Sequence, residues 1–143
     1  FEPALKLQGD KAKGRVLFEA RCAMCHPLDA NAISVGPNLA GMNTRPKEAL
    51  LVDVVDPGSQ VAPDFAAYTI ILKDDEPLAG LIIAENESRV TLPRPNEPDA
   101  VVPRARIGEI RATGRSLMPD GLEEGMSLGD MADLLAFLAG GQF

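Results

Sequence analysis

Cys22-Ala23-Met24-Cys25-His26 holds both cysteines and the one histidine of this 143-residue chain. Two residues separate the thiols, and the histidine follows the second thiol directly. This C-x-x-C-H spacing is typical of covalent haem attachment, in which two thiols form thioethers to one haem. The motif therefore predicts one haem c, attached through Cys22 and Cys25, with His26 as the proximal iron ligand.

Other uses of a C-x-x-C pair fit this sequence less well. A redox dithiol usually follows a strand in a βαβ unit, whereas the residues before Cys22 have the spacing of a helix. A structural zinc site needs four protein ligands, and this chain offers two cysteines and one histidine. A simple disulfide does not require the histidine. Redox dithiol, zinc site and disulfide are kept as alternatives to haem.

The composition fits one acidic globular domain. The length favours a single domain over residues 1–143, and the hydrophobic content of 45% is enough for an ordinary core. No apolar run is long enough to span a bilayer. The formal net charge of −7 disfavours nucleic acid and anionic membranes as partners. It is compatible with a basic electron-transfer partner, or with solubility alone.

Three segments have the apolar spacing of α-helices. The first begins at Asp10, a good N-cap. The last begins after Ser127, with Asp130 at the capping-box position, and ends at Gly140-Gly141. The expected helices cover about 10–21, 46–55 and 128–139.

The region between the second and last helices is rich in β-branched residues and turn signals. Its hairpin pattern predicts a small antiparallel sheet, which we place in a strand-rich insertion over residues 67–112. Turns or loops are expected at 73–77, 86–87 and 93–98. The expected strands are 68–73, 78–84, 88–92 and a short one at 100–102.

The sequence around the motif resembles that of class I cytochromes c. Gly14 and Phe18 match that family's first helix, where the glycine lets the terminal helices cross closely and the aromatic ring packs at the crossing. Gly36-Pro37-Asn38-Leu39 resembles the loop after the family's haem motif, where the proline carbonyl accepts a hydrogen bond from the proximal histidine. The resemblance implies that Pro37 holds His26, a contact that fixes the ring and raises its basicity.

A closer resemblance is to the haem-binding domain found at the C-terminus of large exported proteins of planctomycetes and related bacteria. That domain has a cytochrome c core interrupted by a β insertion, and the likeness extends over nearly the whole chain. It implies a mainly α class I cytochrome c fold, with a small antiparallel sheet inserted between the middle helix and the axial-methionine loop. The matching segments are 22–26, 36–39, Asp56-Pro57 with Val61-Ala62-Pro63, 116–119 and 130–138.

The sixth iron ligand is expected to be a methionine. A single histidine excludes bis-histidine ligation within one chain, and a His/Met pair raises the reduction potential. Met118 lies in a proline-terminated segment before the last helix, the place of the axial methionine in the family, and Met126 is the alternative. Met131 falls on the apolar stripe of the last helix and is more typical of a core residue. The other methionines are Met24, inside the motif, and Met42, shortly after the proline loop.

Further residues are candidates for the haem environment. Buried propionates need hydrogen bonds or cations, for which Arg45, Arg115 and Tyr68 are available. The apolar candidates for the wall of the macrocycle are Phe18, Leu39, Leu50, Leu51 and Leu117.

These features predict an electron carrier rather than an enzyme. Thioether attachment takes place outside the bacterial cytoplasm, so we expect a periplasmic or otherwise exported protein. Its partner is expected to be a redox protein or a fused dehydrogenase domain, and the inserted sheet offers an edge strand for a homodimer. The alternatives are a haem-based ligand sensor or enzyme with a displaceable distal methionine, and a haem-free interaction module.

Overall fold

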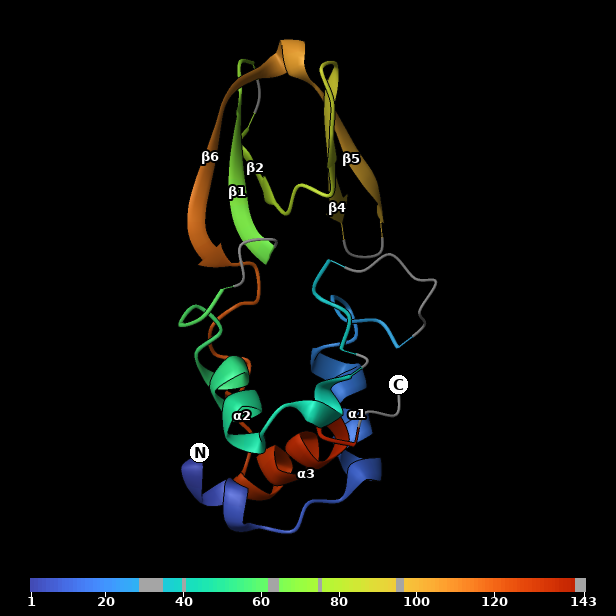
Figure 1. Ribbon diagram of the computed structural model, residues 1–143, viewed down its shortest axis with the longest axis vertical. Helices are drawn as coiled ribbons and strands as arrows, with labels where there is room; N and C mark the ends of the chain where they lie inside the picture. The colour runs from blue at the N-terminus through green and yellow to red at the C-terminus, as the bar shows by residue number, and fades with distance from the viewer. Residues whose placement is uncertain (29–34, 40, 62–64, 75, 95–96, 141–143) are drawn as a thin grey trace.

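A computed structural model of the chain describes residues 1–28, 35–39, 41–61, 65–74, 76–94 and 97–140. Helices gather at one end of the molecule and strands at the other (Figure 1). Four of the sequence expectations fall partly outside the described residues. They are the 73–77 turn at Asp75, the 93–98 loop at Pro95-Asn96, the matching segment at Ala62-Pro63 and the helix stop at Gly141.

The helical end contains three α-helices in the described part of the chain. They are α1 (Lys11–Arg21), α2 (Lys47–Val55) and α3 (Leu128–Leu138). Two short 3-10 helices, η1 (Glu2–Lys6) and η2 (Met42–Thr44), precede α1 and α2. The three α-helices expected from the apolar spacing are therefore confirmed.

The helices begin at the expected caps. The Asp10 carboxylate accepts the N–H of Ala12 at 2.8 Å and that of Lys13 at 3.3 Å. At α3 the Ser127 hydroxyl accepts the Asp130 N–H at 3.1 Å, and the Asp130 carboxylate accepts the Ser127 N–H at 2.8 Å. These N–H groups have no partner within their own helix, so the side-chain oxygens are what fixes each helix start.

α1 crosses α3 with almost no space between the two backbones. A Cβ built on Gly14 would lie 2.0 Å from the carbonyl oxygen of Asp133. A Cβ built on Gly9, just before α1, would lie at the same distance from the carbonyl oxygen of Ala132. Two glycines on one side of the crossing therefore allow the backbones to touch, and the close crossing expected at Gly14 is confirmed.

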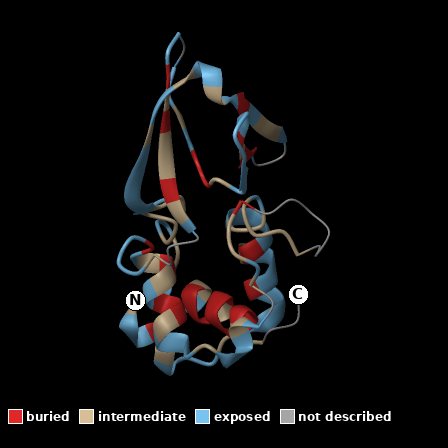
Figure 2. Cartoon of the chain, turned by 45° about the horizontal axis from the view of Figure 1, so that its top comes forward, coloured by how far each residue is buried: buried red, intermediate tan, exposed pale blue. Residues whose placement is uncertain are grey.

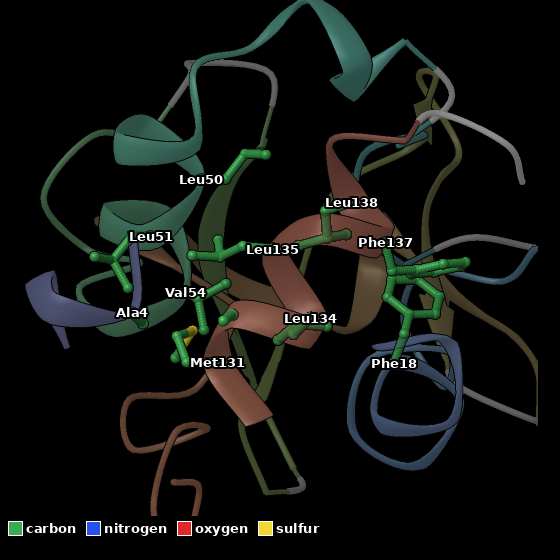
Figure 3. Packing of buried hydrophobic residues seen from close by; sticks show 11 residues of the cluster. Ala4, Phe18, Leu50, Leu51, Val54, Met131, Leu134, Leu135, Phe137 and Leu138 are labelled. Atoms are coloured by element: carbon green, nitrogen blue, oxygen red, sulfur yellow. The ribbon is translucent and has the colours of Figure 1, made fainter. Parts of the chain in front are cut away.

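A hydrophobic core surrounds this crossing, and Figure 2 shows the buried residues along α3. In Figure 3 the Phe18 ring of α1 lies against the Phe137 ring of α3, with centroids 5.3 Å apart and planes inclined by 53°, a favourable tilted arrangement. Met131 is 0% exposed, so its expected place in the core is confirmed. The buried members are Ala4, Phe18, Leu50, Leu51, Val54, Met131, Ala132, Leu134, Leu135, Phe137 and Leu138.

Within the described residues, the strand end forms two three-stranded antiparallel sheets. In the first, β1 lies between β2 and β6, and in the second, β4 lies between β3 and β5. A 3-10 helix, η4 (Arg104–Arg106), connects β5 to β6. The strands are β1 (Ala66–Leu72), β2 (Leu78–Gly80), β3 (Ala84–Glu85), β4 (Arg89–Arg94), β5 (Glu97–Pro103) and β6 (Ile107–Ser116).

The two sheets pack against each other through β2 and β4. A Cβ on Gly80 of β2 would lie 2.9 Å from the Cδ2 atom of Leu92 on β4, so the missing side chain makes room for the leucine. The sheets thus share a second core, separate from that of the helices. Its buried members are Ile70, Leu72, Val90, Leu92 and Val102.

The expected mainly α fold with one small inserted sheet is wrong. Among the described residues the strands contain more residues than the α-helices, and they form two sheets. The described residues of the expected 93–98 loop belong to β4 and β5. No strand was expected where β6 lies, although the expected insertion extended to residue 112. β6 is an edge strand, and most of its residues are exposed. A strand with neither face buried lacks the alternating pattern from which strands are predicted.

We expect Gly14→Ala to destabilise the protein, although alanine is favoured over glycine within a helix by about 0.5–1 kcal/mol. The new methyl group would overlap the Asp133 carbonyl, which is backbone and cannot rotate away. Overpacking of this kind costs about 1–3 kcal/mol. Guanidinium unfolding of the holoprotein should show a lower free energy of unfolding by about that amount.

Gly58→Ala is the matched control, because a Cβ there would meet nothing within 4 Å. This variant should be neutral or slightly more stable, since alanine restricts the unfolded chain. An equal loss of stability in both variants would show that the crossing is not the cause.

Candidate functional site

The C-x-x-C-H motif forms one tight turn at the end of α1. The Cys22 N–H donates to the Phe18 carbonyl at 2.8 Å and so continues the helical hydrogen bonding. The Cys22 carbonyl then accepts the N–H of Cys25 at 3.0 Å and that of His26 at 2.8 Å. α1 thereby positions the two thiols and the imidazole within a single short segment.

Both cysteines are half-buried, and no disulfide joins these two described residues. Burial raises the pKa of the Cys22 thiol to about 11, against the opposing effect of the Arg21 charge. Burial also raises the pKa of the Cys25 thiol. Both side chains are therefore neutral thiols at neutral pH. This argues against a redox dithiol, in which the attacking cysteine has a lowered pKa.

The His26 ring is held by the segment that follows the motif. Its Nδ1 lies 2.9 Å from the Pro37 carbonyl oxygen, the contact that the family resemblance implies. The Gly36 N–H donates to the Cys25 carbonyl at 3.0 Å, which keeps Pro37 beside the ring. Burial lowers the pKa of His26, with the Pro37 contact opposing this effect. A neutral ring that donates from Nδ1 keeps Nε2 as the metal-binding nitrogen.

Gly36 provides the space that the imidazole occupies. A Cβ on Gly36 would lie 2.3 Å from Cε1 of His26 and 2.8 Å from each ring nitrogen. No side chain fits there without displacing the ring. The sequence analysis included Gly36 only as part of a resembling loop, because nothing in a single sequence reveals which ring a glycine lies against.

Met118 follows directly on the end of the first sheet. Ser116, the last residue of β6, pairs with Ala66 of β1, and its hydroxyl accepts the Met118 N–H at 3.1 Å. The half-buried Met118 side chain packs against the helical core, as Cys22 does. The structure therefore brings Met118 and Cys22, which are far apart in the sequence, to the same core.

The five methionines differ in their surroundings. Met131 is fully buried, and Met24 is 62% exposed. Met42, Met118 and Met126 are half-buried and pack against the helical core. Three methionines therefore contact the helical core, against which Cys22 also packs.

The three residues expected near the propionates lie in separate places. The Arg45 guanidinium binds both carboxylate oxygens of Asp53 on α2, at 2.6 and 2.7 Å, and this hydrogen bonding raises the pKa of Arg45. Tyr68 lies on β1 and Arg115 on the exposed edge strand β6. Arg45 is therefore part of the helical end, and the other two belong to the first sheet.

The donor set fits a covalently attached haem. It offers two neutral thiols, one imidazole with Nε2 available and a half-buried methionine beside a common core. In the described part of the chain, no group of three or more His, Cys, Asp or Glu residues is arranged to hold a metal ion. None of the described helices is long and apolar enough to cross a membrane.

Known proteins with similar sequences are described as cytochromes c or as a cytochrome oxidase subunit. Residues 9–79 match the family model described as cytochrome C oxidase, cbb3-type, subunit III. A cytochrome c-553-like protein of Synechocystis sp. is 37% identical over 62 residues, which cover 41% of this chain and 58% of that protein. A cytochrome c of Arabidopsis thaliana is 49% identical over 39 residues, covering 27% of this chain and 35% of that protein.

These similarities support a class I c-type cytochrome. The alignments span less than two thirds of the length of either relative. The family match contains α1, the C-x-x-C-H motif and α2, but it ends within β2. Most of the strand end, and Met118 with it, therefore lies outside the matched region.

We expect Gly36→Ala to displace the His26 ring and to break its contact with Pro37. Loss of that hydrogen bond makes the imidazole a weaker electron donor to the iron. The weaker donation disfavours ferric iron. The reduction potential of the haem-loaded protein should therefore rise, by on the order of 0.05 V within the ~0.8 V range that axial ligands span. Spectroelectrochemical titration measures the potential. Gly58→Ala should leave it unchanged, and an unchanged potential in Gly36→Ala would contradict the proposed contact.

Proposed function

We propose that this chain is a monohaem c-type cytochrome that carries single electrons, with haem c attached through Cys22 and Cys25 and His26 as the proximal ligand. The observation that carries the proposal is the held imidazole, with Nδ1 at the Pro37 carbonyl and the ring against Gly36. The similarity to cytochromes c supports it. When bound, the haem supplies reversible one-electron chemistry.

The chain's own residues have three tasks in this proposal. The cysteines would tether the haem, and His26 would hold its iron. Partly buried apolar residues beside the motif, such as Leu28 and Leu39, keep water away and so favour the lower charge of the ferrous state. The close crossing of α1 and α3 keeps these residues in place during electron transfer.

We propose Met118 as the sixth ligand. The resemblance to the family implies an axial methionine at this place before the last helix. The Met118 side chain is half-buried and packs against the core that Cys22 also contacts. The Ser116 hydroxyl fixes its backbone. An iron ligated by His26 and Met118 has no open position for a substrate, which favours an electron carrier over a haem enzyme or ligand sensor.

The proposed partner is a basic redox protein, or a dehydrogenase domain that donates electrons. Thirteen of the 21 acidic residues but only seven of the 14 basic residues lie outside residues 66–116. The helical end, which bears the C-x-x-C-H motif, therefore carries most of the negative charge. Such a field attracts cationic partners and raises their association rate. The proposed location is the periplasm or another compartment outside the cytoplasm.

Met118→Ala tests the ligand assignment. The variant should lose the weak near-infrared ferric band that reports the sulfur–iron bond. Its reduction potential should fall by on the order of 0.1 V, because a thioether ligand favours ferrous iron. Absorption spectroscopy and spectroelectrochemistry measure the two changes.

Met126→Ala and Met42→Ala are the controls, because both methionines are half-buried at the same core. Each should keep the band. Loss of the band in Met126→Ala but not in Met118→Ala would transfer the role to Met126. Rapid, complete binding of carbon monoxide to the reduced wild-type protein would favour the sensor or enzyme.

The acidic field predicts how small oxidants react with the reduced protein. Tris(1,10-phenanthroline)cobalt(III), a cation, should have a rate constant that falls as salt is added, whereas that of the anion ferricyanide should rise. Stopped-flow kinetics between about 10 mM and 500 mM salt covers the range over which screening becomes nearly complete. The opposite pair of salt dependences would show that the electron leaves through a basic surface.

A further inference from the structure

Arg21 connects the motif to the loop that carries Met118. It is the last residue of α1 and directly precedes Cys22. Its Nη1 donates to the Leu122 carbonyl at 2.7 Å and to the Glu124 carbonyl at 3.0 Å, residues 101 and 103 positions away. One side chain therefore spans from the proximal motif to the segment between Met118 and α3.

The segment between Met118 and α3 consists of turns whose own hydrogen bonds are local. Gly121 and Gly125 adopt positive φ angles of 82° and 76°, which glycine alone tolerates readily. The Glu124 N–H donates to the Gly121 carbonyl and the Met126 N–H to the Glu123 carbonyl, each at 3.0 Å. These bonds shape the loop but do not attach it to α1.

Among the described residues, three sets of hydrogen bonds locate this loop, in addition to the packing of Met118 and Met126 against the helical core. The Ser116 hydroxyl holds its start at Met118, and the Ser127 cap holds its end at α3. Arg21 contacts it between these two points. A guanidinium suits this task because it offers several donors in a rigid plane, and hydrogen bonds from a charged donor are stronger than neutral ones.

We propose that Arg21 is a positioning residue for the sixth iron ligand. Its two contacts hold the loop against α1 and so keep Met118 at the iron. The inference rests on the proposed ligation by Met118. It assigns to Arg21 control over how readily an external ligand displaces the methionine.

The test uses imidazole as the external ligand and follows its binding to the ferric holoprotein. Arg21→Lys keeps the positive charge but loses the planar guanidinium, and Arg21→Gln loses both. Both variants should bind imidazole about tenfold more tightly than the wild type, at the lower end of what charge-assisted hydrogen bonds supply. Loss of the near-infrared band during the titration identifies the displaced ligand as the methionine.

Arg15→Gln is the matched control. Arg15 lies on the same helix and pairs with Glu19 at 2.8 Å, with its side chain 60% exposed. Its substitution should leave the imidazole affinity unchanged. An affinity increase as large as that of Arg21→Lys would overturn the proposal, because a general weakening of α1 would then explain both.

The Met118→Ala variant separates an effect of Arg21 on the methionine ligand from a direct effect of Arg21 on imidazole binding. In Met118→Ala there is no methionine to displace, so adding Arg21→Lys should leave the imidazole affinity unchanged. An equal increase in both backgrounds would overturn the proposal. So would an Arg21→Lys variant with lower global stability in guanidinium but wild-type imidazole affinity. If Met118→Ala retains the near-infrared band, the ligand assignment itself fails, and that result comes from a variant in which Arg21 is intact.

Discussion

The contact between the backbones of α1 and α3 is the constraint on which the rest of this structure depends. Gly14 brings α1 to within contact of the Asp133 carbonyl, and Phe18 packs on Phe137 one turn further along α1. The same helix then ends at Arg21 and continues into the C-x-x-C-H turn. Because the two backbones are in contact at the crossing, it determines where the two thiols and His26 lie relative to the loop before α3.

The two sheets form a second unit with its own hydrophobic core. They are joined to the helical end by the chain before β1 and by the segment after β6, where Ser116 holds the Met118 backbone. The end of an edge strand thus fixes the start of the proposed axial-ligand loop, and Arg21 holds its middle. The negative charge gathers on the helical end and leaves the strand end nearly neutral.

Local signals account for the parts of the fold that the sequence predicted well. Asp10, Ser127 and Asp130 form their caps within three residues of themselves, so a short window of sequence is enough to find them. No strand was expected where β6 lies, because its side chains are mostly exposed. The prolines at 93 and 98 suggested a loop, yet both lie within strands, since an unpaired N–H position tolerates proline.

The chemistry of the site can be read from the amino-acid sequence alone: two thiols and an imidazole at haem-attachment spacing, a first helix with a glycine for close packing, and an excess of acidic residues. Tertiary structure decided what surrounds these groups. Gly36 lies against the His26 ring, and Arg21 reaches carbonyls more than 100 residues away. Such contacts join residues with no fixed spacing along the chain. They form only when packing brings distant segments together. The geometry of a motif or a helix cap, by contrast, depends on residues that are neighbours in the sequence.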